Sequence, residues 1–106
     1  MAEYIKADTG IPIETVTPAN GQEFTLQEMN AFVEGYLEAI PLTADLIMYV
    51  NEEGIRLEKP VNSRATMKLW EYRPDWRSTS ILGDVLIASL AETGDSEQED
   101  AGEEDN

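Results

Sequence analysis

The last fifteen residues of the chain contain no large apolar side chain. From Glu92 to Asn106 there is no Val, Leu, Ile, Met or aromatic residue, and eight of the fifteen residues are acidic. Ordering such a segment costs conformational entropy that no apolar burial offsets. We therefore expect residues 92–106 to be a disordered acidic tail and residues 1–91 to be a single folded domain. A domain of that size buries roughly 60–65% of its unfolded surface, which supports a modest core.

Missing residue types and patterns exclude several classes of protein. The chain has no cysteine and no histidine, so disulfides, thiolate chemistry and the commonest general base are ruled out. It has no Gly-x-Gly-x-x-Gly pattern and no phosphate loop. No run approaches the roughly 18 apolar residues of a membrane span, and no signal peptide is visible. We expect a soluble, cytoplasmic protein that is not an enzyme and has no catalytic residues, metal or cofactor.

The net charge of −15 is distributed unevenly along the chain. Residues 1–54 carry −9 and residues 81–106 carry −9, whereas residues 55–80 carry +3. Repulsion from phosphate groups would oppose the approach of so acidic a protein to DNA or RNA. Direct nucleic-acid binding is therefore disfavoured. The basic segment 55–80 is the exception, because phosphate groups would attract it.

Periodicity and turn residues predict two helices among six short strands. Thr25 and Glu28 form a capping box at the start of the first helix, and Gly35 is expected to end it. Asn62 or Ser63 is expected to cap the second helix, with Ala65, Leu69 and Trp70 facing inward. The helices are expected at residues 25–34 and 63–71, and the strands at residues 4–7, 13–16, 36–40, 46–50, 55–57 and 81–88.

One turn decides how the middle strands connect. Residues 51–54 read as a hairpin turn with Gly54 in a left-handed bulge position, after which residues 55–57 resume alternation. The fold class predicted from these elements is α+β, a single small antiparallel or mixed sheet with two helices packed on it.

Four segments of the chain, taken in order, resemble the family catalogued as domain of unknown function 3846, whose members are mostly small proteins of phages and mobile elements. The resemblance covers about residues 26–88 and implies a phage or mobile-element protein working in a bacterial cytoplasm. It carries over no catalytic residue. The chain departs from the family pattern at Glu34, where a second glycine is frequent. The matching segments are Val33-Glu34-Gly35-Tyr36-Leu37-Glu38, Asn51-Glu52-Glu53-Gly54, Pro60-Val61-Asn62-Ser63-Arg64-Ala65 and Ile81-Leu82-Gly83-Asp84-Val85-Leu86-Ile87.

A cluster of basic and aromatic residues is the most informative candidate binding segment. Both tryptophans and four of the seven basic residues fall within fourteen positions. Arginine beside an aromatic ring can stack on a base and pair with phosphate, and the same residues suit a protein–protein hot spot. The ordinary interpretation is a packed tryptophan surrounded by arginines that pair with acids elsewhere. The candidate residues are Arg64, Lys68, Trp70, Arg73, Trp76 and Arg77.

Acidic residues supply weaker candidates. The pair Glu52 and Glu53 is interpreted as a solvated turn rather than a metal or acid–base site, and Asp84 as a bulge or edge residue rather than a buried functional acid. The acidic tail is interpreted first as a solubilising segment and second as a mimic of a phosphate backbone that engages a basic cleft. Its candidate interaction residues are Asp95, Glu97, Glu99, Asp100, Glu103, Glu104 and Asp105.

These observations favour a non-enzymatic phage or mobile-element accessory protein that binds a host protein. Inhibition of a host defence or nucleic-acid-handling enzyme through acidic surface is the specific form of that hypothesis. The alternative is a binding module for a small phosphorylated ligand, such as a nucleotide, that uses residues 64–77. No membrane partner is expected, and the oligomeric state is left open.

Overall fold

The computed structural model describes residues 2–93, and they form one antiparallel sheet with helices on both faces. The predicted α+β class is confirmed. The predicted start of the disordered tail at residue 92 is wrong, because Glu92 and Thr93 belong to α3 and Thr93 is buried. The rest of the predicted tail, from residue 94 onward, lies outside the described residues. No helix within residues 2–93 has the length and apolar content to cross a membrane. The elements are β1 (Ala2–Ile5), β2 (Glu14–Val16), α1 (Leu26–Val33), β3 (Leu37–Pro41), β4 (Leu46–Asn51), α2 (Ser63–Tyr72), the 3-10 helix η1 (Pro74–Trp76), β5 (Val85–Ser89) and α3 (Leu90–Thr93).

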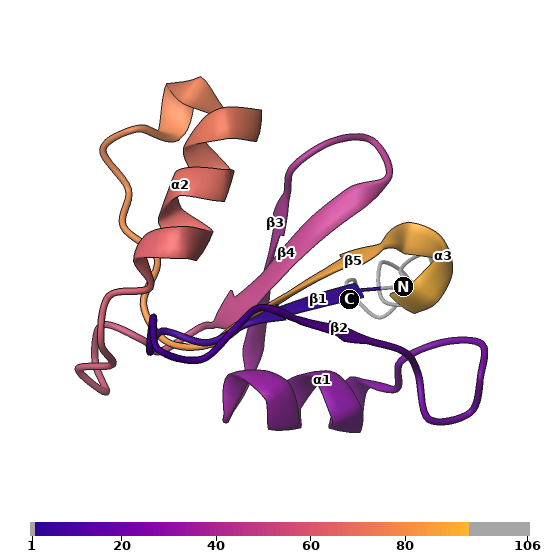
Figure 1. The fold of residues 1–106 in the computed structure, drawn as a ribbon. Coiled ribbons are helices and arrows are strands. Elements are labelled where there is room, and N and C mark those ends of the chain that lie inside the picture. The colour runs from indigo at the N-terminus through magenta and orange to yellow at the C-terminus, as the bar shows by residue number, and fades with distance from the viewer. Residues whose placement is uncertain (1, 94–106) are drawn as a thin grey trace, which may run out of the picture.

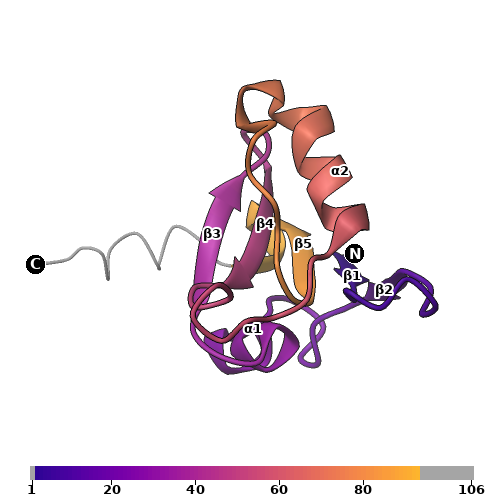
Figure 2. The ribbon, with the colours of Figure 1, turned by 90° about the vertical axis from the view of Figure 1, so that its left-hand side faces the viewer.

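The five strands lie in the order β2-β1-β5-β4-β3, and every neighbouring pair is antiparallel. Of the two sheet types left open, the antiparallel one is therefore observed. Strands β4 and β5 lie inside the sheet, in agreement with their nearly continuous apolar sequences. Strand β3 forms one edge of the sheet and β2 the other (Figures 1 and 2).

The two long helices cover opposite faces of this sheet, with α2 above it and α1 below it in Figure 1. Successive residues of the central strands point to opposite faces of the sheet, so their side chains belong to two separate cores, one on each face. Met48 and Ile87 belong to the same core as Leu69 of α2, whereas Tyr49 and Leu86 belong to the core of Met29 on α1. The inward orientation predicted for α2 is confirmed, because Ala65 and Leu69 are buried and Trp70 packs against the same core.

The hairpin predicted at residues 51–57 is wrong. Residues 52–58 form consecutive turns instead of a returning strand, with the Leu57 amide donating to the Glu53 carbonyl oxygen and the Lys59 amide to that of Gly54. Gly54 does not adopt a left-handed conformation. Its surroundings are tightly packed, because a Cβ there would lie 3.3 Å from Leu82 Cβ.

The last strand begins at Val85 rather than at residue 81. Gly83 has a φ of 83° and redirects the chain just before the strand. The turn needs glycine for this backbone conformation, and a Cβ at this position, 2.8 Å from Lys59 Cδ, would also make the lysine side chain move. Before this turn, only Val61 and Leu82 form a bridge, outside the named strands.

Helix α1 has the predicted N-terminal cap, and it is one residue shorter at each end than the predicted range of 25–34. The capping box is present: Glu28 N donates to Thr25 Oγ1 (3.0 Å), and Thr25 N donates to Glu28 Oε1 (2.8 Å). Glu34, rather than Gly35, is the left-handed C-cap, with φ 64° and ψ 40°. Gly35 is needed for a different reason, because a Cβ there would lie 2.8 Å from Nδ2 of the buried Asn51.

Asn62 is completely buried and joins three segments through one side chain. Its Oδ1 accepts from Ala65 N (3.0 Å), which caps α2 as predicted. Its Nδ2 donates to the carbonyl oxygens of Ile5, at the end of β1, and of Gly83, each at 2.9 Å. The position of α2 over the sheet therefore depends on this amide.

We expect Asn62→Ala to lower the free energy of unfolding by about 3 kcal/mol, since it removes a helix cap and leaves two buried carbonyl groups without a donor. Urea unfolding measured by circular dichroism tests this. Asn20→Ala is the matched control: Asn20 is exposed and its side chain accepts only from the local turn amides of Gln22 and Glu23. An Asn62 variant no less stable than the Asn20 variant would contradict the role assigned to the buried amide.

We expect Glu34→Gly to be more stable than Glu34→Ala by about 1 kcal/mol, because only glycine adopts the left-handed region without steric cost. Both variants lose the ion pair with Lys59, whose Nζ lies 2.9 Å from Glu34 Oε1, so the comparison isolates the backbone contribution. Thermal unfolding of the two variants measures the difference. Equal stabilities would show that the C-cap is not strained.

Candidate functional site

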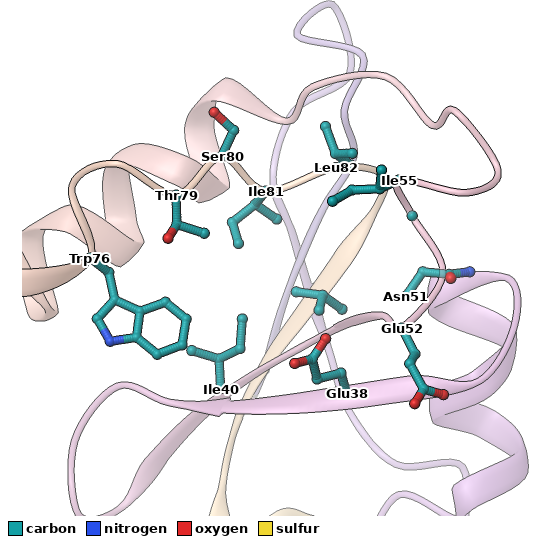
Figure 3. A pocket seen from close by; sticks show the side chains of 12 residues that line it. Glu38, Ile40, Asn51, Glu52, Ile55, Trp76, Thr79, Ser80, Ile81 and Leu82 are labelled. Carbon is teal, nitrogen blue, oxygen red and sulfur yellow. The ribbon is translucent and has the colours of Figure 1, made fainter.

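A groove with a volume of about 170 Å³ opens between β3 and the segment that follows η1 (Figure 3). Glu38 and Ile40 of β3 and Val50 of β4 form its sheet side. Trp76 and Ile81 form the facing side, and both belong to or pack against the α2-side core. The groove exists because η1 carries Trp76 beyond the end of α2 and toward the edge strand.

The charged groups of this groove are acidic. Glu38 and Glu52 are both exposed, and no basic residue lines it within the described part of the chain. Neither carboxylate forms an ion pair within residues 2–93. Figure 3 shows the Glu38 carboxylate directed into the groove and the Glu52 carboxylate turned away from it. A phosphorylated ligand would therefore meet the Glu38 carboxylate here, whereas a basic group would find uncompensated negative charge.

The predicted basic and aromatic cluster is divided between two sides of α2. Arg64 and Lys68 face β1: Arg64 Nη2 donates to the carbonyl oxygens of Lys6 (2.8 Å) and Asp8 (3.0 Å). Lys68 Nζ lies 3.5 Å from Glu3 Oε1. Both side chains therefore attach the first half of α2 to the N-terminal strand and its following loop.

The other members of the cluster lie toward β3. Trp70 Nε1 donates to the Thr79 carbonyl oxygen at 3.0 Å. Arg73 Nη1 donates to the Pro41 carbonyl oxygen at 2.7 Å, and the guanidinium carbon lies 5.3 Å from the centre of the Trp76 ring. The Arg77 side chain is exposed and has no hydrogen bond or ion pair to any described residue. Of the four basic candidates, Arg77 is thus the one whose side chain makes no bond to another described residue.

The acidic candidates within residues 2–93 are Glu52, Glu53 and Asp84, and two of them bind other residues of the fold. Glu53 Oε1 lies 2.6 Å from Arg56 Nη2, whereas Glu52 lines the groove. Asp84 lies just before β5, where its carboxylate accepts from Ala7 N (2.9 Å) and from the Tyr4 hydroxyl (3.3 Å). Within residues 2–93, no three acidic side chains are grouped so that they could hold a metal ion.

The described surface is left with an excess of unpaired acids. Residues 2–93 contain fifteen acidic and seven basic residues. Five of the seven basic residues are in ion pairs, and Arg64 is bonded to backbone carbonyls. The exposed acids that form no ion pair within this part of the chain are Asp8, Glu14, Glu23, Glu38, Asp45, Glu52, Glu58 and Glu71.

The sequence interpretation missed the groove and the acid that points into it. Glu38 and Ile40 lie on a predicted strand, but their role depends on β3 being at the edge of the sheet. Edge position is set by pairing between distant segments, and residues 36–40 themselves carry no pattern that reveals it. Pro41 is the one local signal, because proline is confined to edge strands, bulges and strand ends.

Tyr4 gives a test of the Asp84 contact. Burial, and then the charge and hydrogen bond of Asp84, raise the pKa of Tyr4 from 10.0 to about 12. The folded state therefore holds this proton more tightly than the unfolded chain. Its stabilising contribution is present below pH 10 and lost as the pH rises to about 12. We expect Tyr4→Phe to lose less stability than the wild type over this window, measured by urea unfolding at several pH values.

The matched control is Tyr36→Phe, because the Tyr36 side chain is 72% exposed and has no hydrogen bond within residues 2–93. This variant should follow the wild-type dependence on pH. If the Tyr4 variant also follows it, the Tyr4 hydroxyl does not sense Asp84.

Comparison with known proteins assigns the chain to a family. Comparisons with curated proteins and with solved structures found no match. A family model described as "Domain of unknown function (DUF3846)" matches residues 5–103, which is nearly the whole chain. The chain therefore belongs to the DUF3846 family.

Proposed function

We propose that this chain is a non-enzymatic accessory protein of a phage or mobile element, and that it acts by binding a basic surface of a host protein. One observation carries the proposal. Within residues 2–93 most basic side chains are used to hold the fold together, and eight exposed acids are left without an ion pair. Seven further acids follow after residue 93.

This arrangement of charge suits a particular kind of target. Complementary potentials speed encounter and select partners, more than they add affinity. A surface that combines unpaired carboxylates with a strongly acidic segment is complementary to a cleft that normally holds nucleic acid. We therefore propose a host defence or nucleic-acid-handling enzyme as the target and occupation of its basic cleft as the mode of inhibition.

The alternative, a module for a small phosphorylated ligand, has less support. It needs several free cations on one surface, and Arg64, Lys68 and Arg73 are already bonded within the domain. Arg77 beside Trp76 is the remaining element of such a site. The Glu38 carboxylate, in the groove that Trp76 lines, opposes the same ligand.

We expect the tagged full-length protein to capture one host protein in stoichiometric amount from bacterial lysate at low salt, and to release it at high salt. Release is expected because screening weakens attraction between exposed charges. The captured protein is identified by mass spectrometry. Removing residues 94–106 takes away seven acidic charges and should weaken capture at low salt by about tenfold. This truncation keeps Thr93, whose side chain is buried.

The control variant Arg77→Ala removes the free cation and should leave capture unchanged. Capture that is lost in the Arg77 variant and insensitive to salt would contradict binding through acids. An empty lane at low salt would also contradict it. In that case tryptophan fluorescence across a panel of nucleotides tests the phosphorylated-ligand alternative, which requires a change that Arg77→Ala abolishes.

A further inference from the structure

Strand β3 presents an unpaired edge whose direction is set by its bonds to β4. The Tyr36 carbonyl oxygen accepts from Glu52 N, and Leu42 N donates to the Leu46 carbonyl oxygen, each at 2.8 Å. Hydrogen-bonded pairs alternate along an antiparallel ladder, so the even-numbered residues of β3 bond to β4. The N–H and C=O groups of Leu37 and Ala39 therefore point away from the sheet, and no residue within 2–93 bonds to them.

One end of this edge is closed and the other is open. Pro41 has no N–H to offer, and its carbonyl oxygen is occupied by Arg73 Nη1 at 2.7 Å. The Arg73 guanidinium is held in turn by Asp75 and lies over the Trp76 ring. An added strand can thus use the four backbone groups of Leu37 and Ala39 and cannot continue past Pro41.

Charge disfavours a second copy of this chain as the occupant. Antiparallel self-pairing that uses Leu37 and Ala39 of both copies would place Glu38 directly opposite its symmetry mate. Like charges at directly opposed positions destabilise a strand pair, and charged residues on edge strands prevent such association. The acidic residues after position 93 would meet the same repulsion from Glu38 and Glu52.

The groove beside the edge shows which side chains an added strand would need. Side chains of an added strand alternate between the two faces of the sheet. Those on the Glu38 side would lie next to Glu38 and Ile40, on the face that Trp76 and Ile81 also line, as Figure 3 shows. A basic residue beside Glu38 and an apolar residue beside Ile40, two positions apart, match the charge and the apolar lining of this face.

We propose that β3 is a docking edge for an extended segment of the partner protein, which adds a strand to the sheet and carries a basic and an apolar residue two positions apart. The inference rests on the proposed function, in that it takes the partner to be a protein, and it adds the part of that protein which is bound. Backbone hydrogen bonds to Leu37 and Ala39 provide affinity, and Glu38 and the groove provide specificity.

The test uses the full-length protein labelled with nitrogen-15 and the peptide acetyl-Thr-Val-Thr-Lys-Val-Lys-Thr-amide. Paired antiparallel to β3, this peptide places valine beside Ile40 and lysine beside Glu38. We expect the amide signals of Leu37 and Ala39 to shift on titration, with a Kd below about 1 mM, and their hydrogen exchange to slow by about tenfold or more. Shifts confined to other elements, or none at millimolar peptide, would overturn the proposal.

Two variants and a modified peptide separate edge pairing from simple charge attraction. Ala39→Pro removes the outward N–H and leaves the β3–β4 bonds intact, so it should weaken peptide binding by about tenfold with little change in Tm. Glu38→Gln should weaken binding by about fivefold, whereas Glu71→Gln, at an exposed position on α2, should not change it. The peptide N-methylated at its third and fifth residues should not bind. Equal binding by the Ala39 variant or by the methylated peptide would overturn the proposal.

The same variants distinguish the two proposals from each other. If the captured host protein binds wild type and Ala39→Pro equally, the edge inference fails and the proposed function stands. If the peptide docks on β3 but no protein is captured at low salt, the proposed function fails and β3 remains a strand-docking edge.

Discussion

The buried side-chain amide of Asn62 fixes the position of α2, and much of the candidate site depends on that position. The amide caps α2 and also binds the end of β1 and the turn at Gly83, so the helix, β1 and the approach to β5 are held by one group. With α2 in place, η1 follows directly and brings Trp76 toward Ile40 of β3. The groove is therefore a consequence of how α2 begins, ten or more residues before the tryptophan that lines it.

The basic residues of the chain explain how a domain with so much negative charge keeps its layers together. Arg64 binds the loop that follows β1, Lys68 pairs with Glu3 of β1, and Arg73 binds Pro41 of β3. These three cations, on α2 and at its end, therefore tie the helix to β1 with its following loop and to β3. Arg64 and Arg73 bind backbone carbonyls, which leaves acids unpaired at the surface. These cations thus stabilise the packing of α2 on the sheet. The acids that remain unpaired on the surface are the basis of the proposed function.

Sequence reasoning succeeded where the signal is local. A few neighbouring residues are enough to predict the capping box at Thr25 and Glu28 and the cap at Asn62. The same is true of the apolar strands β4 and β5. Sequence reasoning failed at residues 55–57, where two alternating apolar residues resemble a strand but Ile55 is 82% exposed and no partner strand is present among the described residues. The left-handed C-cap at Glu34 carries no such local signal, because glutamate is not a residue that favours this conformation.

The groove and the edge could not be predicted in this way, because they depend on which strand lies outermost. Glu38 shows why that matters for function. On a central strand it would be a buried charge of high cost, whereas on the edge it is exposed and opposes pairing with another copy. The same carboxylate attracts a strand that brings a basic residue, so one side chain both protects the edge and selects its partner. Arg73 and Pro41 close the far end of the edge, so a docked strand can pair only with Leu37 and Ala39, the two residues on either side of Glu38.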